Sequence, residues 1–220
     1  MRSKEKWLRN CKLYLILDAQ VCSYDALFDI AKQAITYGVD MIQLRDKNGT
    51  ANNILKFSKS VLALTKHKIP YIINDRLDLA LIARADGVHL GQDDISIDVA
   101  RRMMGKRAII GVSCQTLAHA KEAQQKGADY LGFGSVFKTL TKPQRNPMDL
   151  NLLTKVSRAI KIPVFAIGGI NLTNVSMLVQ QGVNRVAVCR SICESRDIRK
   201  SIEAFKSALS LRAKRSNLLS

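Results

Sequence analysis

Short apolar segments and amphipathic helical patterns alternate eight times along this chain. The apolar segments are rich in β-branched residues, as expected for strands that are covered on both faces. They lie near residues 12–18, 39–44, 70–73, 86–90, 107–112, 129–134, 163–167 and 184–189. The helical patterns that follow them lie near residues 24–37, 51–66, 77–83, 96–104, 116–126, 149–160, 172–181 and 197–211. This alternation predicts a parallel sheet and restricts the fold to an α/β barrel or an open α/β sheet.

The positions of the glycines distinguish these two folds. A doubly wound open sheet would carry its phosphate loop after the first strand, but Asp18-Ala19-Gln20 stands there without a G-x-G-x-x-G motif. Glycines cluster instead after the sixth to eighth strands, where barrels commonly bind phosphate. We therefore predict an α/β fold, a single (β/α)8 TIM barrel over residues 1–220. Its core would span about 12–208, with mobile basic ends at 1–10 and 212–220.

The chain is strongly basic, with a formal net charge of +17. A positive field attracts anionic ligands and also nucleic acid. Aromatic residues make up only 5% of the chain and are not interleaved with basic blocks, so we do not expect nucleic acid as a partner.

Cysteines and apolar runs bear on where the protein works. The five cysteines show no C-x2-C spacing, which is typical of a protein in a reducing compartment. The longest apolar run near the N-terminus, Leu13 to Leu17, is too short for a signal sequence or a membrane span. We therefore predict a cytoplasmic protein without a membrane partner. A homo-oligomer is compatible with the sequence, which leaves the oligomeric state open.

Carboxylates follow two neighbouring predicted strands. Asn74-Asp75-Arg76 comes directly after one, and Gln92-Asp93-Asp94 comes just after the next, which ends at His89-Leu90. The carboxyl ends of barrel strands meet at one rim, where active sites are built. Two carboxylates there can share Mg2+. Arg45 and Lys47, at the end of an earlier strand, add positive charge, so this rim has the outline of a polyphosphate site.

Three further segments at the same rim suit a phosphate group. The paired glycines of Gly168-Gly169-Ile170 would let backbone amides approach an anion. Cys189-Arg190-Ser191 leaves the last strand and could complete the same cup. The loop after the sixth strand supplies hydroxyl and ammonium donors from Thr139, Thr141 and Lys142. An ordinary turn or a solvated loop is the structural alternative for each segment.

His89 and Ser113 are the remaining polar residues of interest. His89 lies within an apolar strand, which favours a structural histidine over a catalytic base. No histidine lies near Ser113 in the sequence, so we expect Ser113 to be a hydrogen-bond partner of a ligand rather than a nucleophile.

Together these motifs resemble those of thiamine-phosphate synthases. The resemblance covers about residues 12–208 and rests on six motifs in the family's order: Gln43-Leu44-Arg45-Asp46-Lys47, Asn74-Asp75 with Ala80, Ala85 to Asp94, Gly111-Val112-Ser113, Thr139-Leu140-Thr141-Lys142 and Gly168-Gly169-Ile170. It implies a (β/α)8 barrel that uses Mg2+ to couple a hydroxymethylpyrimidine diphosphate to a hydroxyethylthiazole phosphate. The implied mechanism is dissociative: the bond to diphosphate breaks first, and the thiazole nitrogen then attacks the pyrimidine-methyl cation without a protein nucleophile.

The resemblance also implies a role for each site residue. The pyrimidine diphosphate would be held by Gln43, Arg45, Lys47, Asn74 and Lys142. Arg45, Lys47 and Lys142 would also be catalytic, because they stabilise the departing charge. Mg2+ would be bound by Asp75 and Asp94, and the pyrimidine would contact Ser113. The thiazole phosphate would be held by Thr139, Thr141, Gly169 and the backbone of Cys189-Arg190.

The chain departs from the family pattern at four places. Ser135 and Lys138 stand where the family usually has proline, and Gln115 replaces a frequent histidine. The Cys189-Arg190-Ser191 turn differs from the usual small-residue ending, and the guanidinium of Arg190 would either contact the phosphate or crowd it. Two alternatives stay open: a related thiazole tautomerase, which generally lacks the full diphosphate and metal set, and a non-catalytic barrel that binds phosphate ligands or nucleic acid.

Overall fold

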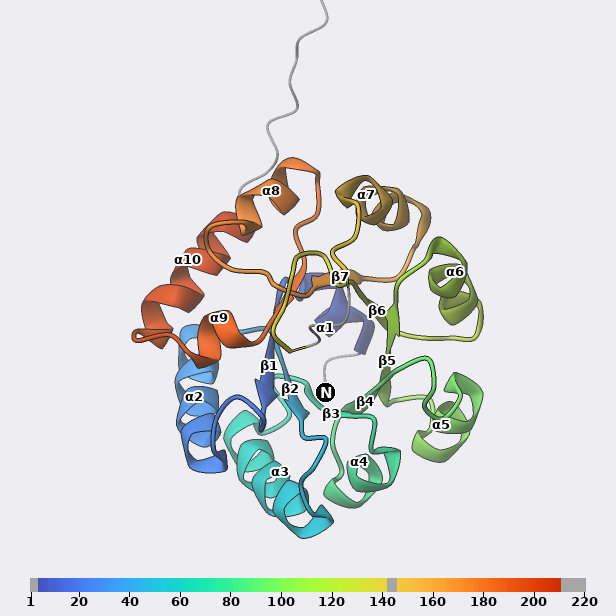
Figure 1. The fold of residues 1–220 in the computed structure, drawn as a ribbon. Helices are drawn as coiled ribbons and strands as arrows, with labels where there is room; N and C mark the ends of the chain where they lie inside the picture. Colours follow the sequence, from blue (N-terminus) through green and yellow to red (C-terminus); the bar gives the residue numbers. More distant parts are fainter. Residues whose placement is uncertain (1–3, 142–145, 211–220) are drawn as a thin grey trace, which may run out of the picture.

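Eight parallel strands close into a barrel, and helices surround it as a ring (Figure 1). The computed structural model describes residues 4–141 and 146–210. The strands are β1 (Leu13–Asp18), β2 (Met41–Arg45), β3 (Tyr71–Asn74), β4 (Gly87–Leu90), β5 (Ile109–Cys114), β6 (Tyr130–Phe133), β7 (Val164–Ile167) and β8 (Val186–Val188). They are hydrogen-bonded in chain order, and β1 also pairs with β8. The predicted TIM barrel is confirmed.

The helices alternate with the strands, with two additions at α1 and α9. They are α1 (Lys4–Asn10), α2 (Tyr24–Tyr37), α3 (Ala51–Thr65), α4 (Leu77–Ala83), α5 (Ile97–Met104), α6 (Leu117–Gln125), α7 (Leu150–Ala159), α8 (Val175–Gln180), α9 (Arg190–Cys193) and α10 (Ile198–Ser210). Local sequence explains where they begin. Ser23, for example, accepts a hydrogen bond from the N–H of Ala26 at the start of α2.

Alternation along each strand divides the core into two parts. In β1, Leu13, Leu15 and Leu17 pack outward against the helices, whereas Tyr14 and Ile16 point into the barrel. The interior cluster contains Tyr14, Ile16, Met41, Ile72, Ile109, Tyr130, Phe165 and Ala187. Side chains alternate between the two faces of a strand, so every second residue points into the barrel. The inward-facing residues near the carboxyl ends of the strands therefore lie at that end of the barrel. This geometry positions the candidate site.

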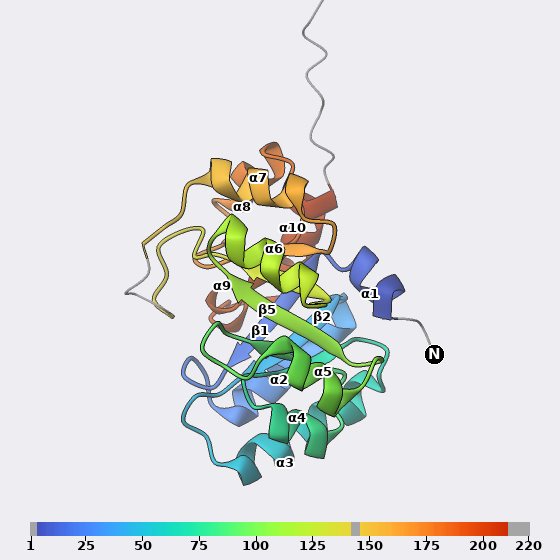
Figure 2. The ribbon, with the colours of Figure 1, turned by 90° about the vertical axis from the view of Figure 1, so that its right-hand side faces the viewer.

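The N-terminal segment differs from the expected mobile end. Residues Lys4–Asn10 form α1, which lies at the end of the barrel opposite the long loop after β6 (Figure 2). Leu8 is buried there, and Arg185 donates hydrogen bonds to the carbonyl oxygens of Arg9 and Cys11. These contacts hold the segment against the barrel. The predicted mobile end at 212–220 lies outside the described residues. None of the described helices is long and apolar enough to cross a membrane.

Candidate active site

A cavity of about 520 Å3 lies at the carboxyl ends of the strands. Most of the predicted site residues line this one cavity, namely Gln43, Arg45, Asn74, Ser113, Thr139, Thr141, Gly169, Cys189 and Arg190. Lys47, Asp75 and Asp94 are next to the cavity but do not form its wall. Lys142 falls outside the described residues. The barrel thus brings together segments that are far apart in sequence.

Asp75 and Asp94 lie close together at the ends of two neighbouring strands. They follow β3 and β4, and their carboxyl groups lie close enough to affect each other's ionisation. Burial raises the pKa of Asp94 above its ordinary value, and the neighbouring carboxyl group of Asp75 raises it further. A hydrogen bond of 2.6 Å from the N–H of Gly91 and the charge of Lys47 lower the pKa of Asp94 in part. The folded surroundings therefore disfavour the ionised form of Asp94.

This donor set fits Mg2+. Magnesium usually takes one or two carboxylates from the protein and completes its octahedron with water and substrate phosphates. Across residues 4–141 and 146–210, no group of three His, Cys, Asp or Glu side chains is arranged to hold a metal ion. The carboxylate pair would therefore supply the protein ligands, and a cation there would offset the charge that raises the pKa of Asp94.

The backbone at Asp75 is unusual. Its φ of 59° lies in the left-handed region, which residues other than glycine rarely adopt. Its N–H donates to the carbonyl oxygen of His89 across the sheet at 2.8 Å. Aspartate tolerates this conformation better than most side chains, and the turn directs the carboxylate toward β4.

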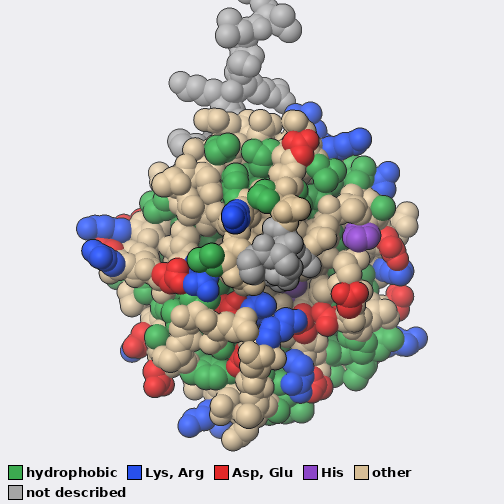
Figure 3. Space-filling view, viewed as in Figure 1, with side chains coloured by type: hydrophobic (Ala, Val, Ile, Leu, Met, Phe, Trp, Pro, Cys, Tyr) green, Lys and Arg blue, Asp and Glu red, His purple; other side chains and the backbone are tan. Residues whose placement is uncertain are grey.

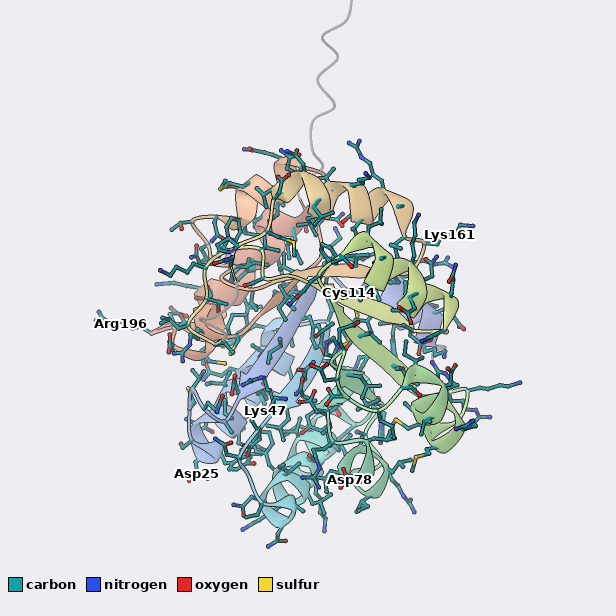
Figure 4. All side chains as sticks on the ribbon, turned by 45° about the vertical axis from the view of Figure 1, so that its right-hand side comes forward. Asp25, Lys47, Asp78, Cys114, Lys161 and Arg196 are labelled. Atoms are coloured by element: carbon teal, nitrogen blue, oxygen red, sulfur yellow. The ribbon has the colours of Figure 1, made fainter. Side chains whose placement is uncertain are left out.

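Two cationic side chains border the same region. Lys47 forms an ion pair with Asp75, and the Nη1 atom of Arg45 lies 2.7 Å from a carboxylate oxygen of Asp18. Lys47 lies within the outline of the molecule in Figure 4, whereas Lys161 and Arg196 project from its edges. Figure 3 shows basic and acidic side chains close together on this face. The face is thus a mosaic of charge rather than a continuous basic patch.

A buried chain of hydrogen bonds crosses the floor of the cavity. Gln43 donates to the hydroxyl of Tyr14, which lies 2.7 Å from the hydroxyl of Tyr130. The ring of His89 bonds to Tyr130 through Nδ1 at 3.0 Å and to the hydroxyl of Ser113 through Nε2 at 2.9 Å. Burial raises the pKa of both tyrosines, so both hydroxyls stay protonated and available as donors.

Tyr14 and Tyr130 are not recognisable as site residues from the sequence motifs, and neither is the contact of His89 with Ser113. These residues lie on different strands, so sequence spacing alone does not reveal their contacts. The alternation of side chains along each strand could have identified these residues, because Tyr14, Tyr130, His89 and Ser113 all lie at inward-facing positions. Gly111 is also required, since a Cβ atom there would lie 2.1 Å from the ring of Tyr130. His89 contacts the hydroxyl of Tyr130 through Nδ1, the ring position at which a Ser-His-Asp triad has a carboxylate.

The opposite side of the cavity is formed by loops after β6, β7 and β8. Gly168 and Gly169 have φ values of 102° and 65°, and a Cβ atom at Gly169 would lie 2.3 Å from the carbonyl oxygen of Lys138. The loop after β6 is fixed to this turn because the N–H of Phe137 donates to the carbonyl oxygen of Gly168 at 2.9 Å. The hydroxyls of Thr139 and Thr141 are thereby placed on the same wall as the paired glycines.

Two of the departures from the family pattern are accounted for by local contacts. The hydroxyl of Ser135 donates to the carbonyl oxygen of Phe137 at 2.9 Å and so braces the loop after β6. The guanidinium of Arg190 forms an ion pair with Glu194, four residues later, and both side chains line the cavity. Arg190 is therefore held by a carboxylate at the edge of the cavity.

This arrangement defines a TIM barrel with a cavity, lined in part by polar side chains, at the carboxyl ends of its strands. Known proteins make the assignment more specific. The family model described as thiamine monophosphate synthase matches residues 13–192. The chain belongs to this family.

Individual relatives agree with the family match. A thiamine-phosphate synthase of Fusobacterium nucleatum is 38% identical over 197 residues, which cover 89% of this chain and 96% of the relative. One of Prochlorococcus marinus strain MIT 9313 is 42% identical over 198 residues. That match covers 89% of this chain but only 56% of the relative, so the chain spans little more than half of the longer Prochlorococcus protein.

A solved structure shows the same fold. The thiamine phosphate pyrophosphorylase of Pyrococcus furiosus superimposes with a TM-score of 0.81 at 35% identity, and the match covers 93% of this chain and 96% of that one. A 3-hexulose-6-phosphate synthase also superimposes, with a TM-score of 0.67 at 19% identity, and this likeness concerns the barrel alone.

Proposed function

We propose that this protein couples 4-amino-2-methyl-5-hydroxymethylpyrimidine diphosphate to hydroxyethylthiazole phosphate, giving thiamine phosphate and pyrophosphate. One observation carries the proposal: the neighbouring carboxylates of Asp75 and Asp94, with Lys47 beside them, adjoin the cavity whose other wall contains Gly169. β3 and β7, which lead to these two regions, are separated by three strands in either direction round the closed barrel. Two phosphorylated substrates can therefore bind with their reactive ends meeting between the regions.

We assign the diphosphate to the side of the cavity formed after β2, β3 and β4. Asp75 and Asp94 would hold Mg2+, which when bound neutralises negative charge on a diphosphate leaving group. Arg45 and Lys47 would contact the diphosphate oxygens, and the same role is proposed for Lys142. Gln43 and Asn74 would orient this substrate and Ser113 would contact its pyrimidine. The thiazole phosphate would take the other side, formed by Thr139, Thr141, Gly169 and the backbone of Cys189-Arg190.

The proposed chemistry needs no protein nucleophile. The C–O bond to the diphosphate breaks, and its electron pair leaves with the pyrophosphate. The thiazole nitrogen then gives its lone pair to the pyrimidine-methyl cation to form the new C–N bond. Arg45 and Lys47 would stabilise the charge that grows on the leaving group, and binding both substrates in one cavity would supply their orientation. The hydrogen-bonded Ser113–His89 pair would fix the pyrimidine rather than attack it.

A turnover assay tests this proposal against its rivals. Purified protein is incubated with both substrates and MgCl2, and thiamine phosphate and pyrophosphate are measured; equal amounts of the two products are expected. Isomerisation of a thiazole carboxylate phosphate without coupling would favour the tautomerase. If neither reaction occurs and RNA binds with a steep salt dependence, the protein is a binding module instead.

We also propose that the activity resides in the cytoplasm. The five cysteines are all free thiols, and Cys11 and Cys114 are buried without forming a disulfide. Free cysteines are usual in a reducing compartment. A thiol-specific reagent added to freshly isolated protein under denaturing conditions should modify all five cysteines.

A further inference from the structure

Asp18 and Arg45 end neighbouring strands and meet at the edge of the candidate site. The parallel register of β1 and β2 pairs the two residues directly, and the N–H of Ala19 donates to the carbonyl oxygen of Arg45 at 3.0 Å. Both lie on the inward face of their strands. Arg45 lines the cavity, whereas Asp18 is fully buried behind it and does not. Asp18 can therefore influence a ligand only through a neighbour.

The contacts of Asp18 hold the guanidinium of Arg45 in one place. One carboxylate oxygen lies 2.7 Å from Nη1 of Arg45, and the other accepts the N–H of Gln20 at 3.0 Å. The same Nη1 also donates to the side-chain oxygen of Gln20 at 3.0 Å. Both contacts use Nη1, which leaves the donors on Nη2 and Nε for an anion.

The buried carboxylate of Asp18 needs the positive charge of Arg45 beside it. A carboxylate that is 0% exposed is costly unless a cation compensates it. Within the described part of the chain, Arg45 is the only lysine or arginine that pairs with Asp18. The buried charge thus ties Arg45 to one position, and an arginine that is already ordered loses less side-chain entropy when a ligand binds.

We propose that Asp18 is a positioning residue that aims the guanidinium of Arg45 at the diphosphate of the pyrimidine substrate. This inference rests on the proposed function, because it takes the diphosphate as the ligand of Arg45. Asp18 also has a structural role, since its carboxylate accepts the N–H of Gln20 in the turn after β1. Asp18→Asn separates the two roles, because the asparagine side-chain oxygen can still accept that N–H while the negative charge that holds Arg45 is removed.

The test compares Asp18→Asn in two backgrounds. In the otherwise wild-type protein, kcat/KM for the pyrimidine diphosphate should fall on the order of tenfold to a hundredfold, as expected when a catalytic cation is misplaced. The KM for the thiazole phosphate should stay within about twofold. In an Arg45→Ala background, Asp18→Asn should cause no further loss of kcat/KM. A loss of equal size in both backgrounds, or no loss in either, would overturn the inference.

Asp29→Asn is the matched control, because it makes the same substitution at an exposed position of α2 and should leave both kinetic constants unchanged. If Asp18→Asn does not fold, Gln20→Ala is used instead. It removes the side-chain oxygen that accepts the second hydrogen bond from Nη1 of Arg45, and it leaves the carboxylate of Asp18 in place. This variant should lower kcat/KM for the diphosphate severalfold, and an unchanged value would overturn the inference.

A binding measurement separates this inference from the proposed function. Inorganic pyrophosphate with Mg2+ is titrated into wild-type and Asp18→Asn protein in a calorimeter. If wild-type protein makes no thiamine phosphate, the coupling activity fails, but weaker pyrophosphate binding by Asp18→Asn, on the order of tenfold, still supports the positioning role. Equal affinity of the two proteins, or no binding by wild-type protein, would overturn it.

Discussion

At the scale of single residues, the site depends on polar groups that are buried and hydrogen-bonded to one another. The chain from Gln43 through Tyr14 and Tyr130 to His89 and Ser113 satisfies each of these groups with another side chain. In a low-dielectric interior such a network specifies the orientation of each member. The hydroxyl of Ser113 therefore reaches the cavity in an orientation set by residues from four other strands.

Removal of the Tyr130 hydroxyl should disturb this network. Tyr130→Phe keeps the ring but leaves Tyr14 and His89 each without one partner, so the free energy of unfolding should fall by about 1–3 kcal/mol. The turnover number should fall as well, because the ring of His89 would no longer be held beside Ser113. Urea denaturation and steady-state kinetics measure the two effects. Tyr37→Phe, which alters a tyrosine on the outer ring of helices, is the control, and an equal effect there would count against a specific role for Tyr130.

The raised pKa of Asp94 predicts how the metal-free protein responds to pH. A carboxyl group whose pKa is higher in the folded than in the unfolded state contributes stability that is fully present below its unfolded pKa, which is about 3.9. That stability is lost as the pH rises through the folded pKa. At pH 7 in the presence of EDTA, Asp94→Asn should therefore unfold at a higher temperature than wild-type protein. A lower unfolding temperature of Asp94→Asn would show that the folded protein stabilises the ionised carboxylate of Asp94 instead of destabilising it.

Magnesium should reverse this order. If the ion binds the folded pair of carboxylates as proposed, it should raise the unfolding temperature of wild-type protein more than that of Asp94→Asn. The gain should diminish as the pH falls and Asp94 becomes protonated. Thermal unfolding scans with and without MgCl2 across a pH series measure both trends.

At the scale of elements, the strands and the eight main helices could be predicted from periodicity alone. Each strand was found within two residues of its expected start, because strands covered by helices are short, apolar and bounded by turn residues. The helices α1 and α9 were missed, since 7 and 4 residues are too few to show a helical period. The contact of His89 with Ser113 was missed for a different reason, because it depends on the register of β4 against β5.

The turn after β7 should tolerate no side chain at Gly169. Gly169→Ala combines a positive φ with a Cβ atom 2.3 Å from the carbonyl oxygen of Lys138, so the loop after β6 must move. The expected loss is about 1–3 kcal/mol of stability, together with at least a tenfold rise in the KM for the thiazole phosphate. The KM for the pyrimidine diphosphate should change little.

Gly127→Ala provides the matched comparison for this turn. Gly127 has a φ of 85°, but nothing lies within 4 Å of its added Cβ atom. It therefore carries the same kind of backbone strain without the collision. A similar rise in the KM for the thiazole phosphate in both variants would show that the contact with the loop after β6 is irrelevant.

At the scale of the whole molecule, closure of the barrel combines segments that the sequence keeps far apart. One side of the cavity comes from the segments after β6 to β8, and Asn74, at the end of β3, lies on the other side. The sequence motifs predicted that these segments would share one rim, since the carboxyl ends of all barrel strands meet there. They did not show that Arg45 and Lys47 would each already be paired with a carboxylate, Asp18 and Asp75 respectively.

The net charge of +17 should make stability depend on ionic strength. Mutual repulsion of the excess positive charges destabilises the compact state, and salt shortens the range of this repulsion from about 30 Å at 0.01 M to about 8 Å at 0.15 M. Raising the NaCl concentration over this range should therefore raise the unfolding temperature by a few degrees. KCl should give the same shift, because screening depends on ionic strength. A fall in the unfolding temperature would show that attractive ion pairs outweigh the repulsion.

The left-handed backbone at Asp75 restricts which amino acids can evolve there. Glutamate carries the same charge, yet its longer side chain lacks the compact polar group that makes this conformation tolerable, and β-branched residues would be strained outright. A saturation library at this position should return glycine, asparagine and aspartate among well-folded proteins, and aspartate alone among active ones. Here the shape of the main chain, as much as the proposed binding of a metal ion, selects the side chain.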